Sequence, residues 1–312
     1  MGRYLVRKIG GLAITLLIAS FLIYAAIYVA PGDPATLIAG GHATPQLLAQ
    51  IRTDYHLNDP LPTRYWDWLH GVLHGNLGLS FVYRQSVTSL LGARVGNTVF
   101  LVLYASLLIL LGGIGLGILS ALMRRTGAAI TVGTSVGLAT PSFVAAIILT
   151  TVFAVNLGWF PVFGAGVGFS DRLWHLTLPA VALALSWLAY VAQITKTSVR
   201  DELDREHVDT ARARGLPERE IIRKHVLRNA MIPITTVSGL TIAGLLAGTV
   251  VVETAFGISG IGSFLVQSVS AKDFAVVQAI SLIMVATFVI LNAVVDVLNG
   301  ALDPRVRVVG TG

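Results

Sequence analysis

Six long stretches of this chain contain no Asp, Glu, Lys or Arg, and they constrain its fold more than any other feature. The first covers residues 9–30, and its 22 residues can cross a hydrocarbon layer of about 30 Å as one helix. The other stretches cover residues 97–123, 127–170, 173–195, 229–252 and 274–295. In lipid every backbone polar group needs an internal partner, so we predict an all-α, polytopic membrane protein with six transmembrane helices.

The third stretch has 44 residues, which is too long for a single span. We expect its helix to end near Asn156, because Gly158, Trp159 and Pro161 indicate a turn at the membrane surface. Pro141 is predicted to kink this helix.

Three pairs of glycines have the four-residue spacing that lets helices approach closely. They are Gly113 with Gly117, Gly133 with Gly137, and Gly244 with Gly248. We interpret them as sites of helix packing.

Two polar excursions are predicted on one side of the membrane. The first, residues 31–96, follows the first span and includes an expected helix over residues 45–55. The second, residues 253–273, is rich in Gly and Ser and is interpreted as a loop. His70 and His74 are four residues apart, but a pair alone is not a ligand set, so we predict no metal site.

The basic residues predict the orientation of the chain. With the N-terminus inside, the inner segments hold 16 of the 22 Lys and Arg and the outer segments hold 6. The positive-inside rule therefore predicts that both termini are cytoplasmic. The net charge is +6, and the basic residues cluster at the ends of the apolar runs, as orientation signals do. We therefore predict no nucleic-acid partner.

Most of the remaining charge lies in one cytoplasmic segment, residues 196–233, which carries nine Lys and Arg and seven acids. Charges of both signs at helical spacing are typical of short solvated helices. A connector between two spans and a surface that docks into a partner are both consistent with this pattern.

Several chemistries are excluded by the residues themselves. None of the four lysines follows a glycine, so no phosphate-binding loop is present and any ATP must be bound by another chain. No stretch combines a nucleophile, a base and an acid, so we predict a protein that is not an enzyme. Three classes remain: a transporter driven by a separate ATPase, an ion-coupled secondary transporter, and a channel or scaffold. No run has a charge near its centre, which disfavours ion coupling.

The segment Asp209-Thr210-Ala211-Arg212-Ala213-Arg214-Gly215 resembles the EAA loop of bacterial ABC importer permeases, with Thr210 in place of the first alanine. After it, His225-Val226-Leu227-Arg228 lacks the proline of the general family, and is similar to the form found in the dipeptide/oligopeptide/nickel branch. Further stretches resemble that branch: PGDP at 31–34, LNDPLP at 57–62, GNLGLS at 75–80, RVGNT at 94–98, VET at 252–254 with Phe256, Gly260 and Gly262, and DPR at 303–305.

The resemblance implies a type I ABC importer permease of the bacterial inner membrane. It implies a first helix with an extracytoplasmic region over residues 1–93 and a permease core over residues 94–312, with the coupling loop at 196–230. The implied ATPase-coupling residues are Asp209, Thr210, Ala211, Arg212, Ala213, Arg214, Gly215, Leu216 and Pro217. Those implied for the outer gate or the binding protein are Glu253, Phe256, Gly260 and Gly262.

The implied partners are a homologous second permease, two ATP-binding subunits, an extracytoplasmic substrate-binding protein and membrane lipid. This chain itself holds no cofactor, and ATP and Mg are expected on the ATPase subunits. Dipeptides or other short peptides are the expected cargo, with nickel or haem-type cargo as alternatives.

Overall fold

The computed structural model of the chain describes residues 2–29, 34–39, 43–54 and 57–302. These residues are almost entirely helical and contain no named strand, which confirms the all-α prediction. The chain forms two compact units. One consists of Met1–Thr98 and Ser259–Val289, and the other of Val99–Ile258 and Ile290–Gly312. The division expected at residues 93 and 94 stays a prediction.

Within the described residues, five helices are long and apolar enough to cross a membrane, and a sixth span is obtained if one bent pair is counted. The five are Arg7–Ala26, Val87–Leu122, Gly168–Leu203, Glu218–Ala255 and Phe274–Val297, and the bent pair is Thr126–Ala139 with Ser142–Asn156. The fold is therefore that of a polytopic helical membrane protein.

The first unit contains α1 (Gly2–Val29), α2 (Pro34–Ala39), α3 (Pro45–Asp54), α4 (Leu61–Leu73), α13 (Ile261–Ser270) and the adjoining parts of α5 (Val87–Leu108) and α14 (Phe274–Leu302). The expected helix at 45–55 is thus confirmed as α3. Helix α4 packs on α1 through Tyr65, whose hydroxyl lies 2.8 Å from the Ser20 hydroxyl. A separate apolar cluster joins α5, α13 and α14 around Leu91, Phe264 and Ile280.

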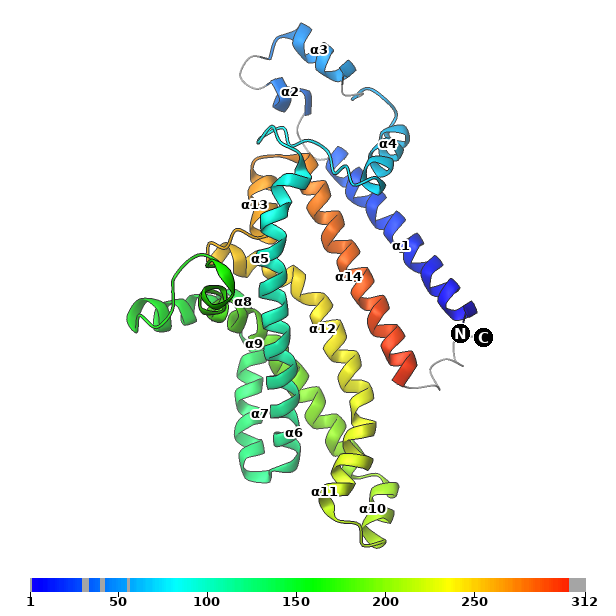
Figure 1. Ribbon diagram of the computed structural model, residues 1–312, viewed down its shortest axis with the longest axis vertical. Coiled ribbons are helices and arrows are strands. Elements are labelled where there is room, and N and C mark those ends of the chain that lie inside the picture. Colours follow the sequence, from blue (N-terminus) through cyan, green and yellow to red (C-terminus); the bar gives the residue numbers. More distant parts are fainter. Residues whose placement is uncertain (1, 30–33, 40–42, 55–56, 303–312) are drawn as a thin grey trace. The chain divides into compact units, whose positions relative to one another are not determined.

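The second unit is built around α9 (Gly168–Leu203). The other elements are η2 (Ile109–Gly113), α6 (Ile114–Leu122), α7 (Arg124–Ala139), α8 (Ser142–Leu149), η3 (Thr150–Asn156), α10 (Glu206–Ala213), α11 (Glu218–Glu220), η4 (Ile221–Val226) and α12 (Leu227–Ala255). Helices α6 and α7 form a hairpin beside α9, and α10 and α11 lie together where α9 ends and α12 begins (Figure 1). The buried core includes Leu101, Leu183 and Leu245, from α5, α9 and α12.

The third apolar stretch bends at Pro141 as predicted, but the bend is a break between two helices and not a kink within one. Helix α7 ends at Ala139, α8 begins at Ser142, and the two are bent by 105°. The bend leaves the Thr140 carbonyl outside a helix, and the Ser186 hydroxyl donates a 2.6 Å hydrogen bond to it. The predicted end at Asn156 is confirmed as the last residue of η3.

Two of the three glycine pairs pack against other helices as predicted. A Cβ added to Gly117 would lie 2.4 Å from Thr195 Cβ, and one on Gly113 would lie 3.0 Å from the Leu188 carbonyl oxygen, so α6 and η2 touch α9 closely. Gly244 and Gly248 likewise face Trp187 and Leu183. The prediction was wrong for Gly133, which has no atom within 4 Å of its Cβ position.

The second excursion is mostly helical, and its interpretation as a loop was wrong. Glu253 belongs to the last turn of α12, and residues Ile261–Ser270 form the ten-residue helix α13. Only a short turn over residues 256–260 separates the two helices. Of the other motifs, residues 31–33 and 303–305 lie outside the described residues.

Candidate functional site

The predicted coupling residues occupy α10 and the turn that follows it. Asp209 to Ala213 lie in α10, and Arg214 ends the helix. Gly215 has a φ of +76°, a left-handed conformation that side chains disfavour. Pro217 then precedes α11. Gly215 and Pro217 therefore form the turn between the two loop helices, α10 and α11.

One face of α10 fixes the helix to the rest of the second unit. Val208 and Ala211, three residues apart, are buried at 0% and 4% exposure. They pack in a cluster with Val199 of α9 and with Ile221 and Val226 of η4. Residues three apart share one side of a helix, so this contact fixes the rotation of α10 about its own axis.

The opposite face of α10 and the turn are exposed. The exposed set is Asp209, Thr210, Arg212, Ala213, Arg214, Gly215, Leu216 and Pro217. Leu216 is an apolar side chain on this otherwise polar surface, with 36% exposure. Eight of the nine predicted coupling residues thus form one accessible surface, and the ninth, Ala211, belongs to the anchor.

An ion-paired network ties α10 to α11 across the turn. Arg212 donates hydrogen bonds to both carboxylate oxygens of Glu218, at 3.0 and 3.4 Å, and lies 3.4 Å from Asp209. The hydrogen bond to Glu218 raises the pKa of the Arg212 guanidinium, and the same bond lowers the pKa of the Glu218 carboxyl. Because the pairs are exposed, they stabilise the turn only modestly.

A second polar link joins three elements at the base of the loop. The Glu202 carboxylate, near the end of α9, accepts a 2.9 Å hydrogen bond from the Asn229 amide of α12. The same carboxylate lies 3.3 Å from His207 of α10. Sequence reasoning missed Glu202, His207 and Asn229, because residues separated by up to 27 positions give no local signal.

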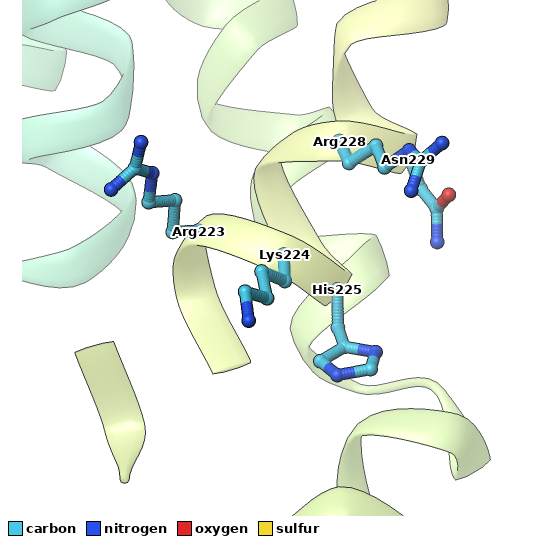
Figure 2. A pocket seen from close by; sticks show the side chains of 5 residues that line it. All are labelled: Arg223, Lys224, His225, Arg228 and Asn229. Atoms are coloured by element: carbon cyan, nitrogen blue, oxygen red, sulfur yellow. The ribbon is translucent and has the colours of Figure 1, made fainter. Parts of the chain in front are cut away.

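A basic hollow lies beside the loop where η4 meets α12. It is lined by Arg223, Lys224, His225, Arg228 and Asn229. Figure 2 shows that these side chains spread in different directions and do not converge on one point. Lys224 is already paired with Glu220 at 2.6 Å. The hollow is therefore a basic surface and not a built anion site.

The predicted outer-gate residues Glu253 and Phe256 are buried in the second unit, with 0% and 1% exposure. The Phe256 carbonyl accepts a 3.0 Å hydrogen bond from the Gly164 amide, and the Phe163 ring lies near Gly257. These residues join the end of α12 to the loop before α9.

Gly260 and Gly262 lie at the start of α13 in the first unit, and both are buried. Three residues of the RVGNT motif hold this helix. The Thr98 hydroxyl accepts a 2.8 Å hydrogen bond from the Ile261 amide, and the Asn97 amide donates a 2.9 Å hydrogen bond to the Ser259 carbonyl. The Arg94 guanidinium lies 3.9 Å from the centre of the Phe264 ring.

The other end of α13 is held in a similar way. The Ser80 hydroxyl donates a 2.5 Å hydrogen bond to the buried carboxylate of Asp273, and the Asp273 amide donates to the Ser268 carbonyl at 2.8 Å. The GNLGLS motif, which ends at Ser80, therefore contacts the turn between α13 and α14. Sequence resemblance found these motifs but not their pairing.

The described part of the chain contains no group of three or more His, Cys, Asp and Glu side chains that could hold a metal ion. The His70 and His74 rings are 4.3 Å apart, but the Nδ1 atom of His74 is already hydrogen-bonded to the His70 carbonyl at 2.8 Å.

Fold and site together define a class: a helical subunit that spans the membrane and presents an anchored, polar helix outside it. The chain belongs to the family of binding-protein-dependent transport system inner membrane components, whose model matches residues 113–308. A second model, for the N-terminal part of such membrane components, matches residues 1–102. The protein is thus a permease subunit of an ABC importer, of the dipeptide/oligopeptide/nickel branch, and not an enzyme.

Named relatives and a solved structure agree with this assignment. The chain is 36% identical to the glutathione transport system permease protein GsiC of Salmonella choleraesuis, over 98% of this chain and 99% of that one. The protein of the same name from Escherichia coli K12 is equally similar over the same shares. The inward-facing MetNI methionine ABC transporter superposes with a TM-score of 0.55 at 15% identity, over 69% of this chain and 96% of that chain.

Proposed function

We propose that this permease imports short peptides and that α10 with the following turn is the coupling site for a separate ATPase. In this arrangement the loop at 196–230 is cytoplasmic and both termini lie on the same side, as the count of basic residues predicts. The ATPase subunits hold ATP and Mg. A homologous second permease completes the path, and an extracytoplasmic binding protein delivers the cargo.

The observation that carries the coupling role is the way α10 is held. The helix is anchored on its inner face by Val208 and Ala211 and is linked through Glu202 to both α9 and α12. A displacement of the exposed face of α10 is therefore transmitted to the two long helices α9 and α12. An exposed helix docked in a partner's groove is a common mode of recognition.

We assign short peptides as the cargo because the named relatives are glutathione permeases that match nearly the whole chain. Glutathione is itself a short peptide, so this assignment includes the dipeptides and other short peptides that the sequence motifs imply. No feature of the described residues favours nickel or haem-type cargo over peptides.

The four residues proposed for the outer side form part of a gate and do not face the binding protein directly. Glu253, Phe256, Gly260 and Gly262 are all buried. A buried side chain can set the position of α12 and α13, but a partner protein cannot touch it without a rearrangement.

The test is purification of the complete complex and its reconstitution in vesicles. We expect two ATP-binding subunits and a second permease to co-purify, and uptake of labelled glutathione or a dipeptide to require ATP and the binding protein. A matched preparation with an ATPase variant that cannot hydrolyse ATP serves as the control. Transport without nucleotide, or a complex without an ATPase, would refute the proposal. Uptake of nickel alone would refute only the cargo.

A further inference from the structure

Polar side chains recur along one face of α9. They are Ser186, Tyr190, Gln193, Thr197 and Arg200, at spacings of four, three, four and three residues. Such spacing places all five within a narrow stripe of the helix surface. Between Ser186 and Thr195, the other residues of α9 are Trp, Leu, Ala, Val and Ile. The stripe is therefore a polar face on an otherwise apolar helix.

Helix α7 extends this face with two polar residues one turn apart. The Gln193 amide donates a 3.4 Å hydrogen bond to the Ser135 hydroxyl, and the Lys196 ammonium donates a 2.6 Å hydrogen bond to the Thr131 hydroxyl. These four side chains, with Thr197, Arg200 and Asp201, line an open hollow of about 400 Å³. Every side chain that lines it is polar.

The hollow reaches into the membrane-spanning part of both helices. Gln193 lies near the end of the span predicted over residues 173–195, and Ser135 lies four residues before the end of α7, which is the first half of the bent pair. Val132 and Val136, each next to a hollow residue on α7, are 66% and 63% exposed and apolar. Polar groups are costly in lipid and apolar ones are not, so the valine face suits lipid and the hollow suits water.

The inner end of the hollow has an excess of positive charge. Lys196 bonds to a neutral hydroxyl, and neither it nor Arg200 forms an ion pair with any residue that the structure describes. Asp201 is the one acid among the seven residues of the lining. A carboxylate that enters the hollow would meet two cations there.

We infer that this α7–α9 hollow lines the aqueous path for the cargo, and that Lys196 and Arg200 attract the carboxylate of the peptide near the inner end. The identity of the cargo rests on the proposed function. The aqueous, cationic character of the hollow does not.

The experiment uses the absence of cysteine in this chain. Single cysteines replace Ser135, Gln193 or Thr197 in the hollow, and Val132 or Val136 on the neighbouring face. The complete complex, in vesicles with the loop side accessible, is treated with two membrane-impermeant methanethiosulfonate reagents, one anionic and one cationic. Thiols react as thiolates, which form in water and not in lipid. The valine positions are matched controls for Ser135 because all three residues lie within one turn of α7.

We expect the hollow cysteines to react at least tenfold faster than the valine-site cysteines. At Thr197→Cys, the anionic reagent should be favoured, and Lys196→Gln with Arg200→Gln should lower the ratio of anionic to cationic rates at least threefold. Lys196→Arg should preserve the ratio.

Equal rates on both faces would overturn the aqueous path. An unchanged rate ratio would overturn the role of the two cations. These readouts require no cargo, so failure to transport glutathione would affect only the proposed function.

Discussion

Replacement of Gly215 by valine changes only the turn that follows α10. A Cβ at this position meets no atom within 4 Å in the chain, so the substitution causes no clash. Its effect comes from the backbone, because φ is +76° and a β-branched residue disfavours the left-handed region. Asparagine tolerates this region better than other residues with a side chain. Gly215→Asn is therefore the matched control.

The left-handed conformation costs an ordinary L-residue about 1–2 kcal/mol. If only the native turn lets α10 dock, that energy lowers the docked population about 5- to 30-fold. We expect the ATP hydrolysis stimulated by loaded binding protein to fall by that factor in Gly215→Val. For Gly215→Asn the loss should stay within about threefold, because asparagine is enriched in this region.

The assay measures stimulated ATP hydrolysis by purified complexes of equal subunit content, reconstituted in vesicles. Wild-type activity in Gly215→Val would refute the idea that this turn positions a docking helix. Equal losses in the valine and asparagine variants would refute the backbone argument, since they would mean that any side chain in this open space blocks the partner.

Three further substitutions test the packing, each by denaturant unfolding of the purified chain in detergent. Gly117→Ala should destabilise the chain by about 1–3 kcal/mol, because the new Cβ would overlap α9. Gly115→Ala, whose Cβ position is open, should stabilise the chain by about 0.5–1 kcal/mol. Equal effects of the two substitutions would contradict the close contact. Thr98→Val should lower the free energy of unfolding by about 1–3 kcal/mol, because it leaves the buried Ile261 amide at the start of α13 without its acceptor. An unchanged free energy of unfolding would show that this hydrogen bond is dispensable. Phe256→Ala should lower the free energy of unfolding by about 3–5 kcal/mol, because its ring is buried. Phe163→Ala, at a ring that is 68% exposed, should change the free energy of unfolding by no more than about 0.5 kcal/mol.

The spans and the coupling loop could be predicted because their signals are local. Long uncharged runs give helices of the right length wherever they occur. The turn at Gly215 and Pro217 is likewise encoded by the two residues that form it.

The sharp angle between α7 and α8 and the position of α13 could not be predicted, because each depends on a partner far away in the sequence. Pro141 weakens a helix, but it does not set an angle of 105°. That bend leaves the Thr140 carbonyl outside a helix, and the carbonyl accepts a hydrogen bond from Ser186, 46 residues later. The first amide of α13 is bonded by Thr98, 163 residues earlier.

These distant contacts explain why motifs that look unrelated in the sequence occur together. A buried amide without an acceptor destabilises a fold, so a helix that begins in a Gly-rich turn requires a hydroxyl or carbonyl from elsewhere. The RVGNT motif supplies the hydroxyl of Thr98, the amide of Asn97 and the cation of Arg94, and all three meet the segment that begins at Ser259. A substitution in the RVGNT motif alone leaves polar atoms of the Ser259 segment unpaired, and a substitution in that segment alone leaves polar atoms of the motif unpaired. The double variant Thr98→Val with Ile261→Pro, which removes both the hydroxyl and the amide, should therefore lose less free energy of unfolding than the sum of the losses in the two single variants.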